Sequence, residues 1–195
     1  MSLRKDAAFI YKHAIQHSLP DRAVTDALSH FRRPTGKLLL IAIGKAAWQM
    51  AKAAHDVLDG RIDGGAVITK YGHSRGEIGV LEIYEAGHPV PDRAGIQATA
   101  RVLSLTEGLS AEDTVLFLVS GGGSALFEYV DFPLPDLISL TQEMLACGAS
   151  IEEMNTVRKH LSAVKGGRFA QHVSPAKVFA IVLSDIISSR PDMIA

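Results

Sequence analysis

The chain has 195 residues and carries 20 lysines and arginines against 21 aspartates and glutamates, which gives a formal net charge of −1 at pH 7. This length suffices for one domain with a sizeable core. Because its charges balance, the chain lacks the excess of positive charge with which proteins bind nucleic acid or an anionic membrane surface. No apolar run approaches the roughly 18 residues of a membrane span, and the amino terminus lacks a signal-peptide core, so we expect a cytoplasmic protein.

Apolar runs and helical patterns alternate along the chain. Short continuous apolar runs predict buried strands, whereas apolar residues three or four apart predict helices. The expected order is one or two helices over 6–30, a strand over 37–43, a helix over 46–58, strands over 64–69 and 81–85, a helix over 93–107, a strand from 114, helices over 136–147 and 151–160, and a final buried strand over 177–184. This alternation predicts an α/β fold, a three-layer α/β/α sandwich with a mostly parallel sheet.

Two helix starts have cap signals. Pro20 predicts a break within 6–30, with Asp21 as the N-cap of a second helix. Asp92 follows a proline-rich loop and is placed to cap the helix over 93–107.

The only cysteine, Cys147, lies at the end of the helix expected over 136–147. A single cysteine cannot form an internal disulfide, which suits a reducing compartment. We expect Cys147 to be a buried packing residue and not a catalytic one.

The stretch 114–126, TVLFLVSGGGSAL, has the pattern of a buried strand, a tight glycine turn and a helix start. Successive residues without Cβ let backbone N–H groups converge on an anion, and a helix N-terminus would add partial positive charge. Alternatively, the glycines only permit a strand-to-helix corner, and Ser124 is a plain N-cap. The candidate site for a phosphate or a carboxylate comprises Ser120, Gly121, Gly122, Gly123 and Ser124.

Other polar residues follow the expected strands, and the carboxyl ends of parallel strands gather at one edge of a sheet. Gly44 and Lys45 follow the first strand, so Lys45 could neutralise the charge of a transferring phosphoryl group. Alternatively, Lys45 lies on the first turn of a helix and extends its charged end into solvent. Asp185 follows the last strand and is a candidate magnesium ligand, or else a cap. His88, in the proline-rich loop, reads more readily as a loop histidine than as a base.

A basic cluster precedes the last strand. Its positive charges are Arg158, Lys159, Lys165 and Arg168, and the intervening Gly166 and Gly167 permit close backbone approach to a ligand. The alternative is a solvated charge run. Neither the Walker pattern nor G-x-G-x-x-G is present, so the two commonest nucleotide signatures are missing.

Five segments together resemble the glycerate 2-kinases of the MOFRL type, a family also named hydroxypyruvate reductases. They are IAIGKAAWQMA at 41–51, AGHPVPD at 86–92, FLVSGGGSALF at 117–127, EMNTVRKHLSAVKGGRFA at 153–170 and LSD at 183–185. The resemblance extends over residues 5–195 and implies a Rossmann-like amino-terminal domain, with the carboxy-terminal MOFRL domain absent. The sequence departs from the family pattern at 186–195, where a short Gly-Asp-containing turn is usual.

The resemblance implies an ATP-dependent, Mg²⁺-assisted phosphorylation of D-glycerate at its 2-hydroxyl to 2-phosphoglycerate, a reaction of carbohydrate metabolism. By its position, Lys45 matches the family's lysine that acts on the transferring phosphoryl group, and residues 120–124 match its glycine-rich loop. Arg158, Lys159 and 165–167 match its basic motif, for which contact with phosphate or the substrate carboxylate is implied.

Two other hypotheses remain open at this stage. The family's older name suggests an NAD(P)H-dependent hydroxypyruvate reductase, although a dinucleotide fingerprint is missing. The chain could instead be a truncated fragment that binds an anion without activity. We also expect that an exposed face would favour a homo-oligomer.

Overall fold

The computed structural model describes residues 2–184. Within them the helices are α1 (Leu3–Ser18), α2 (Asp21–Leu28), α3 (Ala47–Leu58), α4 (Arg93–Leu105), α5 (Gly123–Leu126), α6 (Leu134–Ala146), α7 (Ile151–Leu161) and α8 (Arg168–His172). The strands are β1 (Leu38–Ile43), β2 (Gly64–Lys70), β3 (Glu82–Ala86), β4 (Thr114–Ser120) and β5 (Lys177–Leu183). The order of elements expected from the sequence is confirmed, with boundary shifts of a few residues.

The strands form one parallel sheet in the order β3-β2-β1-β4-β5. Ile41 in β1 is paired with Ala66 of β2 on one side and with Phe117 of β4 on the other. The chain therefore builds the sheet outward from β1 in one direction and then returns to add β4 and β5 in the other. The gap between the ends of β1 and β4 is the switch point at which sheets of this kind bind ligands.

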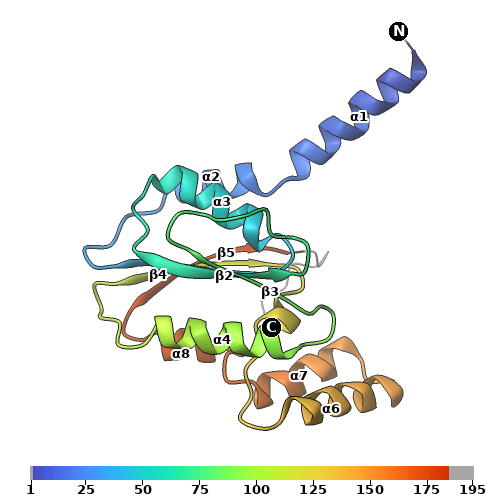
Figure 1. Cartoon of the computed structure of the whole chain (residues 1–195), viewed down its shortest axis with the longest axis vertical. Coiled ribbons are helices and arrows are strands. Elements are labelled where there is room, and N and C mark those ends of the chain that lie inside the picture. The colour runs from blue at the N-terminus through green and yellow to red at the C-terminus, as the bar shows by residue number, and fades with distance from the viewer. Residues whose placement is uncertain (1, 185–195) are drawn as a thin grey trace.

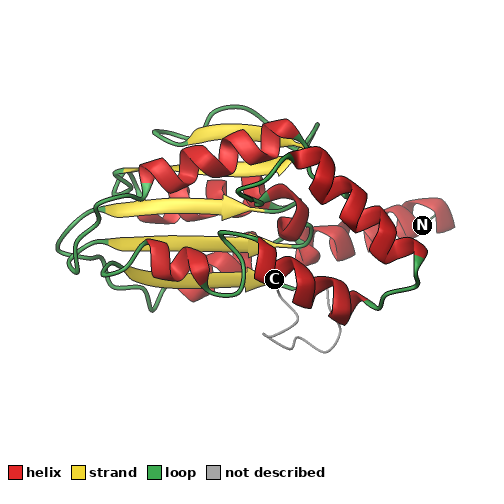
Figure 2. Cartoon of the chain, turned by 90° about the horizontal axis from the view of Figure 1, so that it is seen from below, coloured by secondary structure: helices red, strands yellow, loops and turns green. Residues whose placement is uncertain are grey.

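Helices cover both faces of this sheet, which confirms the α/β/α sandwich expected from the sequence (Figures 1 and 2). On one face, α2 and α3 pack against alternate strand residues such as Leu40 and Leu116. On the other, α4 and α8 cover a second core that includes Ile41, Val115 and Phe169. Because successive strand residues point to opposite faces, a strand buried on both sides is apolar throughout.

Two parts of the chain lie apart from these layers. Helix α1 extends away from the sheet, has no buried residue, and exposes apolar side chains such as Phe9, Tyr11 and Ile15 (Figure 1). Helices α6 and α7 lie together beyond α4, next to the carboxyl end of the sheet (Figure 2). None of the helices among residues 2–184 has the length and apolar character that a membrane crossing requires.

Three local expectations are wrong. Asp21 is the first residue of α2, whose N-cap is Pro20, and its carboxylate instead accepts a hydrogen bond from Gln49. Cys147 is exposed at the C-cap of α6 and is not a buried packing residue. The side chains of β5 are exposed or half-buried although the strand is apolar, because within residues 2–184 β5 pairs with β4 on one side only. By contrast, the N-cap of α4 is confirmed, since the Asp92 carboxylate accepts a hydrogen bond from Gly95 N at 2.9 Å.

Candidate functional site

The segments that follow β1 and β4 are hydrogen-bonded to each other at the switch point. Lys45 N donates to Gly121 O at 2.9 Å. Gly44 has φ +111°, and a Cβ there would lie 2.3 Å from the hydroxyl oxygen of Ser120. Only glycine fits this position, because a side chain would collide with β4 and the backbone is in the left-handed region.

The Ser120 hydroxyl joins the two segments and is buried. Its oxygen accepts a hydrogen bond from Ala46 N at 3.0 Å, and it donates to Ile43 O at 3.2 Å. The sequence predicted Ser120 as part of an anion site, but its hydroxyl is hydrogen-bonded to backbone groups. Ser120 fixes the end of β4 against the start of α3, so its contribution to the site is structural.

The glycine turn brings Lys45 and His88 together. Gly122 has φ +86°, and a Cβ at this position would lie 2.8 Å from the His88 ring and 3.3 Å from Lys45 Cγ. Three segments from the ends of β1, β3 and β4 therefore meet at Gly122. His88 belongs to this group of residues, although the sequence analysis set it aside as a loop histidine.

The helix that follows the glycine turn is short. Helix α5 spans only Gly123–Leu126, and its N-cap is Gly122, so the interpretation of Ser124 as the N-cap is wrong. The partial charge of a helix terminus comes from aligned peptide units, and four residues supply little of it. Any anion at this turn would depend on backbone N–H groups and neighbouring cations.

Lys45 is exposed and lines a pocket of about 340 Å³ on the α3 side of the turn. The same pocket is lined by His73 and Arg75, which the sequence analysis did not single out. His73 Nδ1 lies 3.0 Å from Lys45 O, and the Arg75 guanidinium lies 5.9 Å from the centre of the Trp48 ring. The signal that could have indicated them is the polar, glycine-bearing stretch that follows β2.

A second pocket, of about 410 Å³, opens on the α8 side of the turn. Its walls are mostly apolar and include Phe117, Phe127 and Phe169. The predicted site residues that line it are Gly123, Lys159, Lys165, Gly166 and Gly167. The structure therefore brings one residue of the glycine turn and most of the basic motif to one pocket, separate from the pocket that Lys45 lines.

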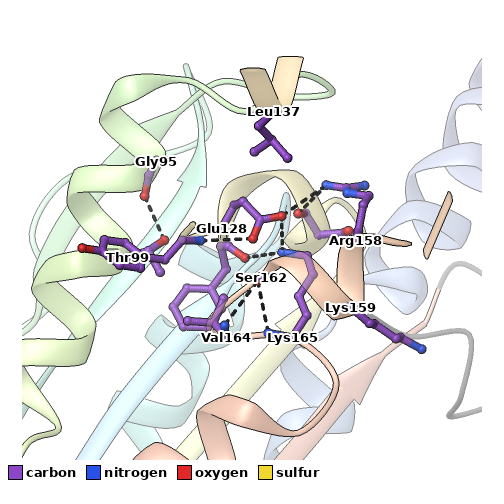
Figure 3. Close-up of polar contacts among 12 residues, drawn as sticks. Gly95, Thr99, Glu128, Leu137, Arg158, Lys159, Ser162, Val164 and Lys165 are labelled. Carbon is purple, nitrogen blue, oxygen red and sulfur yellow. Dashed lines mark hydrogen bonds and ion pairs between the residues drawn. The ribbon is translucent and has the colours of Figure 1, made fainter. Parts of the chain in front are cut away.

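Two cations of the basic motif, Arg158 and Lys165, are turned away from solvent. Lys165 Nζ lies 2.9 Å from a carboxylate oxygen of Glu128, and Arg158 Nη2 lies 3.8 Å from the same oxygen (Figure 3). The side chains of Glu128 and Lys165 are only 1% and 2% exposed. Burial lowers the pKa of Lys165 to about 8, against the opposing effect of the Glu128 carboxylate, and burial also lowers the pKa of Arg158.

The remaining candidate site residue, Asp185, lies outside the described residues. Within residues 2–184, no group of three His, Cys, Asp or Glu side chains is arranged to hold a metal ion. The magnesium assignment at Asp185 therefore stays a prediction.

Comparison with known proteins places the chain in a family. Residues 6–195 match the family described as a domain of unknown function, DUF4147. The chain belongs to this family. It is 56% identical over 196 residues to the D-glycerate 2-kinase of Thermotoga maritima, a match that covers 100% of this chain and 46% of that protein. It is also 40% identical to a putative hydroxypyruvate reductase of Agrobacterium vitis, covering 100% of this chain and 44% of that protein.

A solved structure agrees with these relatives. The crystal structure of a glycerate kinase from Thermotoga maritima matches with a TM-score of 0.89 at 55% identity, over 98% of this chain and 46% of that one. The resemblance to glycerate 2-kinases expected from the five sequence segments is confirmed. The chain spans about half the length of the relatives it matches.

Proposed function

We propose that this chain supplies the phosphate-binding half of a glycerate 2-kinase, an enzyme that transfers the terminal phosphoryl group of ATP to the 2-hydroxyl of D-glycerate and forms 2-phosphoglycerate. The observation that carries the proposal is the meeting of Lys45, His88 and the glycine turn at the switch point of the sheet. The similarity of the chain to proteins named glycerate 2-kinase supports the same reaction. We further propose that residues 5–195 form the amino-terminal domain of a two-domain cytoplasmic enzyme.

In this proposal the two pockets have different tasks. Lys45 places a positive charge beside the turn and stabilises negative charge on the transferring phosphoryl group. In the other pocket, Lys159 and the backbone of Gly166 and Gly167 hold a second anionic group, either a phosphate of the nucleotide or the carboxylate of glycerate. Both glycines have positive φ, 62° and 86°, and their exposed backbone can approach a ligand closely.

The residues present fit the phosphates of ATP, because each pocket is lined in part by cations and by glycine backbone. For magnesium we propose Asp185 as a ligand, in keeping with its place after β5. A bound magnesium ion would neutralise phosphate oxygens, while the residues of this chain orient the nucleotide and the substrate. We also propose that the protein forms a homo-oligomer, and the exposed apolar side chains of α1 are consistent with such a contact.

A reductase is the second candidate, because one relative is named a putative hydroxypyruvate reductase. Such an enzyme would transfer a hydride from NAD(P)H to hydroxypyruvate. The sequence has no G-x-G-x-x-G segment to hold a dinucleotide pyrophosphate, which favours the kinase.

A chimera separates the two candidates. This chain replaces the matching 46% of the Thermotoga maritima D-glycerate 2-kinase, and the product is assayed for ATP-dependent phosphorylation of D-glycerate and for oxidation of NADH by hydroxypyruvate. We expect phosphorylation, and a decrease of about 100-fold in kcat for Lys45→Met, as when a charge-stabilising donor is removed. The matched control is Lys52→Met, since Lys52 is an exposed lysine on α3 paired with Asp56.

Full phosphoryl transfer by the Lys45→Met chimera would refute the role of Lys45. Oxidation of NADH without phosphorylation of glycerate would refute the kinase and support the reductase. A soluble, folded chimera with neither activity would contradict both candidates.

A further inference from the structure

Glu128 is the most deeply buried carboxylate that contacts the basic motif, and the sequence analysis assigned it no role. It lies shortly after the glycine turn, at the end of the segment that includes α5, and is 1% exposed. Leu137 of α6, which is also 1% exposed, lies on the same side of the cluster as Glu128 (Figure 3). A buried carboxylate is costly unless charges and hydrogen bonds compensate it, so its partners show what it does.

Its two cationic partners, Arg158 in α7 and Lys165 between α7 and α8, connect that part of the chain to the residues that follow the glycine turn. Each cation that is paired with Glu128 also donates a hydrogen bond to the backbone near it. Lys165 Nζ donates to Phe127 O at 2.7 Å, and Arg158 Nη2 donates to Ser124 O at 2.8 Å. Glu128 Oε1 accepts a hydrogen bond from Tyr129 N at 3.1 Å, which orients the carboxylate. Two long side chains from one segment therefore bind both the carboxylate and the backbone of the other.

This arrangement turns neighbouring residues of the basic motif in different directions. Arg158 and Lys165 point toward Glu128, whereas Lys159 points away from it (Figure 3). Lys159 lines the apolar-walled pocket with Gly123, Gly166 and Gly167. The inward side chains thus fix the backbone from which the pocket-lining groups project.

Glu128 is the group on which this arrangement depends. The cluster holds two cations and one carboxylate, and the Arg158 and Lys165 side chains are 13% and 2% exposed. Without the carboxylate, two like charges would remain buried side by side, and each would be driven toward solvent. Such a movement would displace the α7–α8 segment from the turn.

We propose that Glu128 is a positioning residue, which holds Arg158 and Lys165 and thereby aligns Lys159, Gly166 and Gly167 with Gly123 around one anion-binding pocket. The assignment of this pocket to an anion rests on the proposed function. The alignment itself does not, because it follows from the contacts of residues 124–128 with residues 158–165.

The test uses this chain with the variant Glu128→Gln, which keeps the shape of the side chain and removes its charge. The matched control is Glu82→Gln, because Glu82 of β3 forms a partly exposed ion pair with Arg101 of α4. Backbone amide spectra of the ligand-free protein are recorded first. We expect the amide signals of Gly123, Lys159 and Gly166 to move together in Glu128→Gln and to stay in place in the control.

Titration with inorganic phosphate gives the second readout. We expect affinity to fall about tenfold in Glu128→Gln, in the range found when an outer residue that orients binding groups is removed. Unchanged amide positions together with unchanged phosphate affinity would overturn the proposal. If the wild-type chain binds no phosphate, the anion pocket of the proposed function fails, and the amide positions still decide the role of Glu128.

The titration of Lys165 gives a readout that a merely structural change elsewhere would not move. The side-chain NMR signal of Lys165 reports its protonation, and its midpoint should fall in Glu128→Gln, because the facing carboxylate is lost and Arg158 remains. An unchanged midpoint of the Lys165 titration would contradict the ion pair between Lys165 and Glu128.

If Glu128→Gln does not fold, the double variant Glu128→Gln/Lys165→Met removes both partner charges and is expected to fold. Wild-type phosphate affinity and amide positions in that folded double variant would overturn the proposal.

Discussion

Lys165 makes the stability of this protein increase with pH in a range where many proteins lose stability. Its side chain is 2% exposed, and burial lowers its pKa from 10.5 to about 8. In the unfolded chain the amine keeps its ordinary pKa, so between pH 8 and 10.5 the unfolded state binds more protons than the folded state. The free energy of unfolding therefore rises with pH across this window. Below about pH 8 both states are protonated, and the cost of the buried charge is fully present.

The magnitude follows from the shift. A difference of about 2.5 pKa units corresponds to about 3 kcal/mol of destabilisation at neutral pH. Between pH 7.5 and 9.5 we expect about 2 kcal/mol of this to be recovered, because Lys165 becomes neutral in the folded state first. Burial and the hydrogen bond that its hydroxyl donates to Glu82 raise the pKa of Tyr84, and a hydrogen bond donated to Asp92 raises the pKa of Tyr71, so neither tyrosine ionises in this range.

The assay is equilibrium urea unfolding at several pH values from 7.5 to 9.5, on the wild-type chain and on Lys165→Met. The variant removes the titrating amine and keeps an unbranched side chain, so the pH dependence of all other groups cancels in the difference. We expect the wild type to gain about 2 kcal/mol relative to the variant across this range. A flat difference, or one that falls with pH, would show that Lys165 is not buried as a charged group and would refute the reasoning.

Three further predictions concern the turn and its surroundings. Ser120→Ala should lower the free energy of unfolding by about 1–3 kcal/mol in urea unfolding, because a buried backbone N–H and a carbonyl lose their partner. Gly122→Ala should destabilise the fold more than Gly60→Ala in the same assay, since both have positive φ but only Gly122 lies against His88; equal losses would contradict this. Backbone hydrogen bonds donated by Ser110 N and Lys37 N lower the pKa of Asp113, so stability should decrease as the pH falls toward that pKa. Asp113→Asn should weaken this acid dependence in unfolding curves from pH 6 to 3.

The sequence was sufficient to predict the fold because the signals for it are local. Continuous apolar runs at 37–43 and 114–119 indicated buried parallel strands, and both lie at the centre of the sheet. Burial was harder to predict at the edges. The apolar run of β5 does not distinguish a central strand from an edge strand, because strand order is set by distant pairings.

The sequence also indicated which residues gather at the switch point. Gly44 and the glycine turn follow two strands, and the carboxyl ends of parallel strands share one edge, so their meeting follows from the fold class. The role of the Ser120 hydroxyl could not be predicted, because its hydrogen-bond partners lie more than 70 positions away in the chain.

The amino-acid sequence by itself determined the order of the elements, the parallel sheet, and the placement of Lys45 and the glycine turn at its carboxyl edge. Only the tertiary structure decided which cations of the basic motif are paired with a buried carboxylate. Lys159 and Lys165 have the same side chain, lie six positions apart and both line the apolar-walled pocket, yet Lys159 points away from Glu128, whereas Lys165 is paired with Glu128 in the interior. The physical reason is that the direction of a side chain depends on the packing of its own segment against distant residues, and a buried charge is stable only where that packing supplies an opposite one.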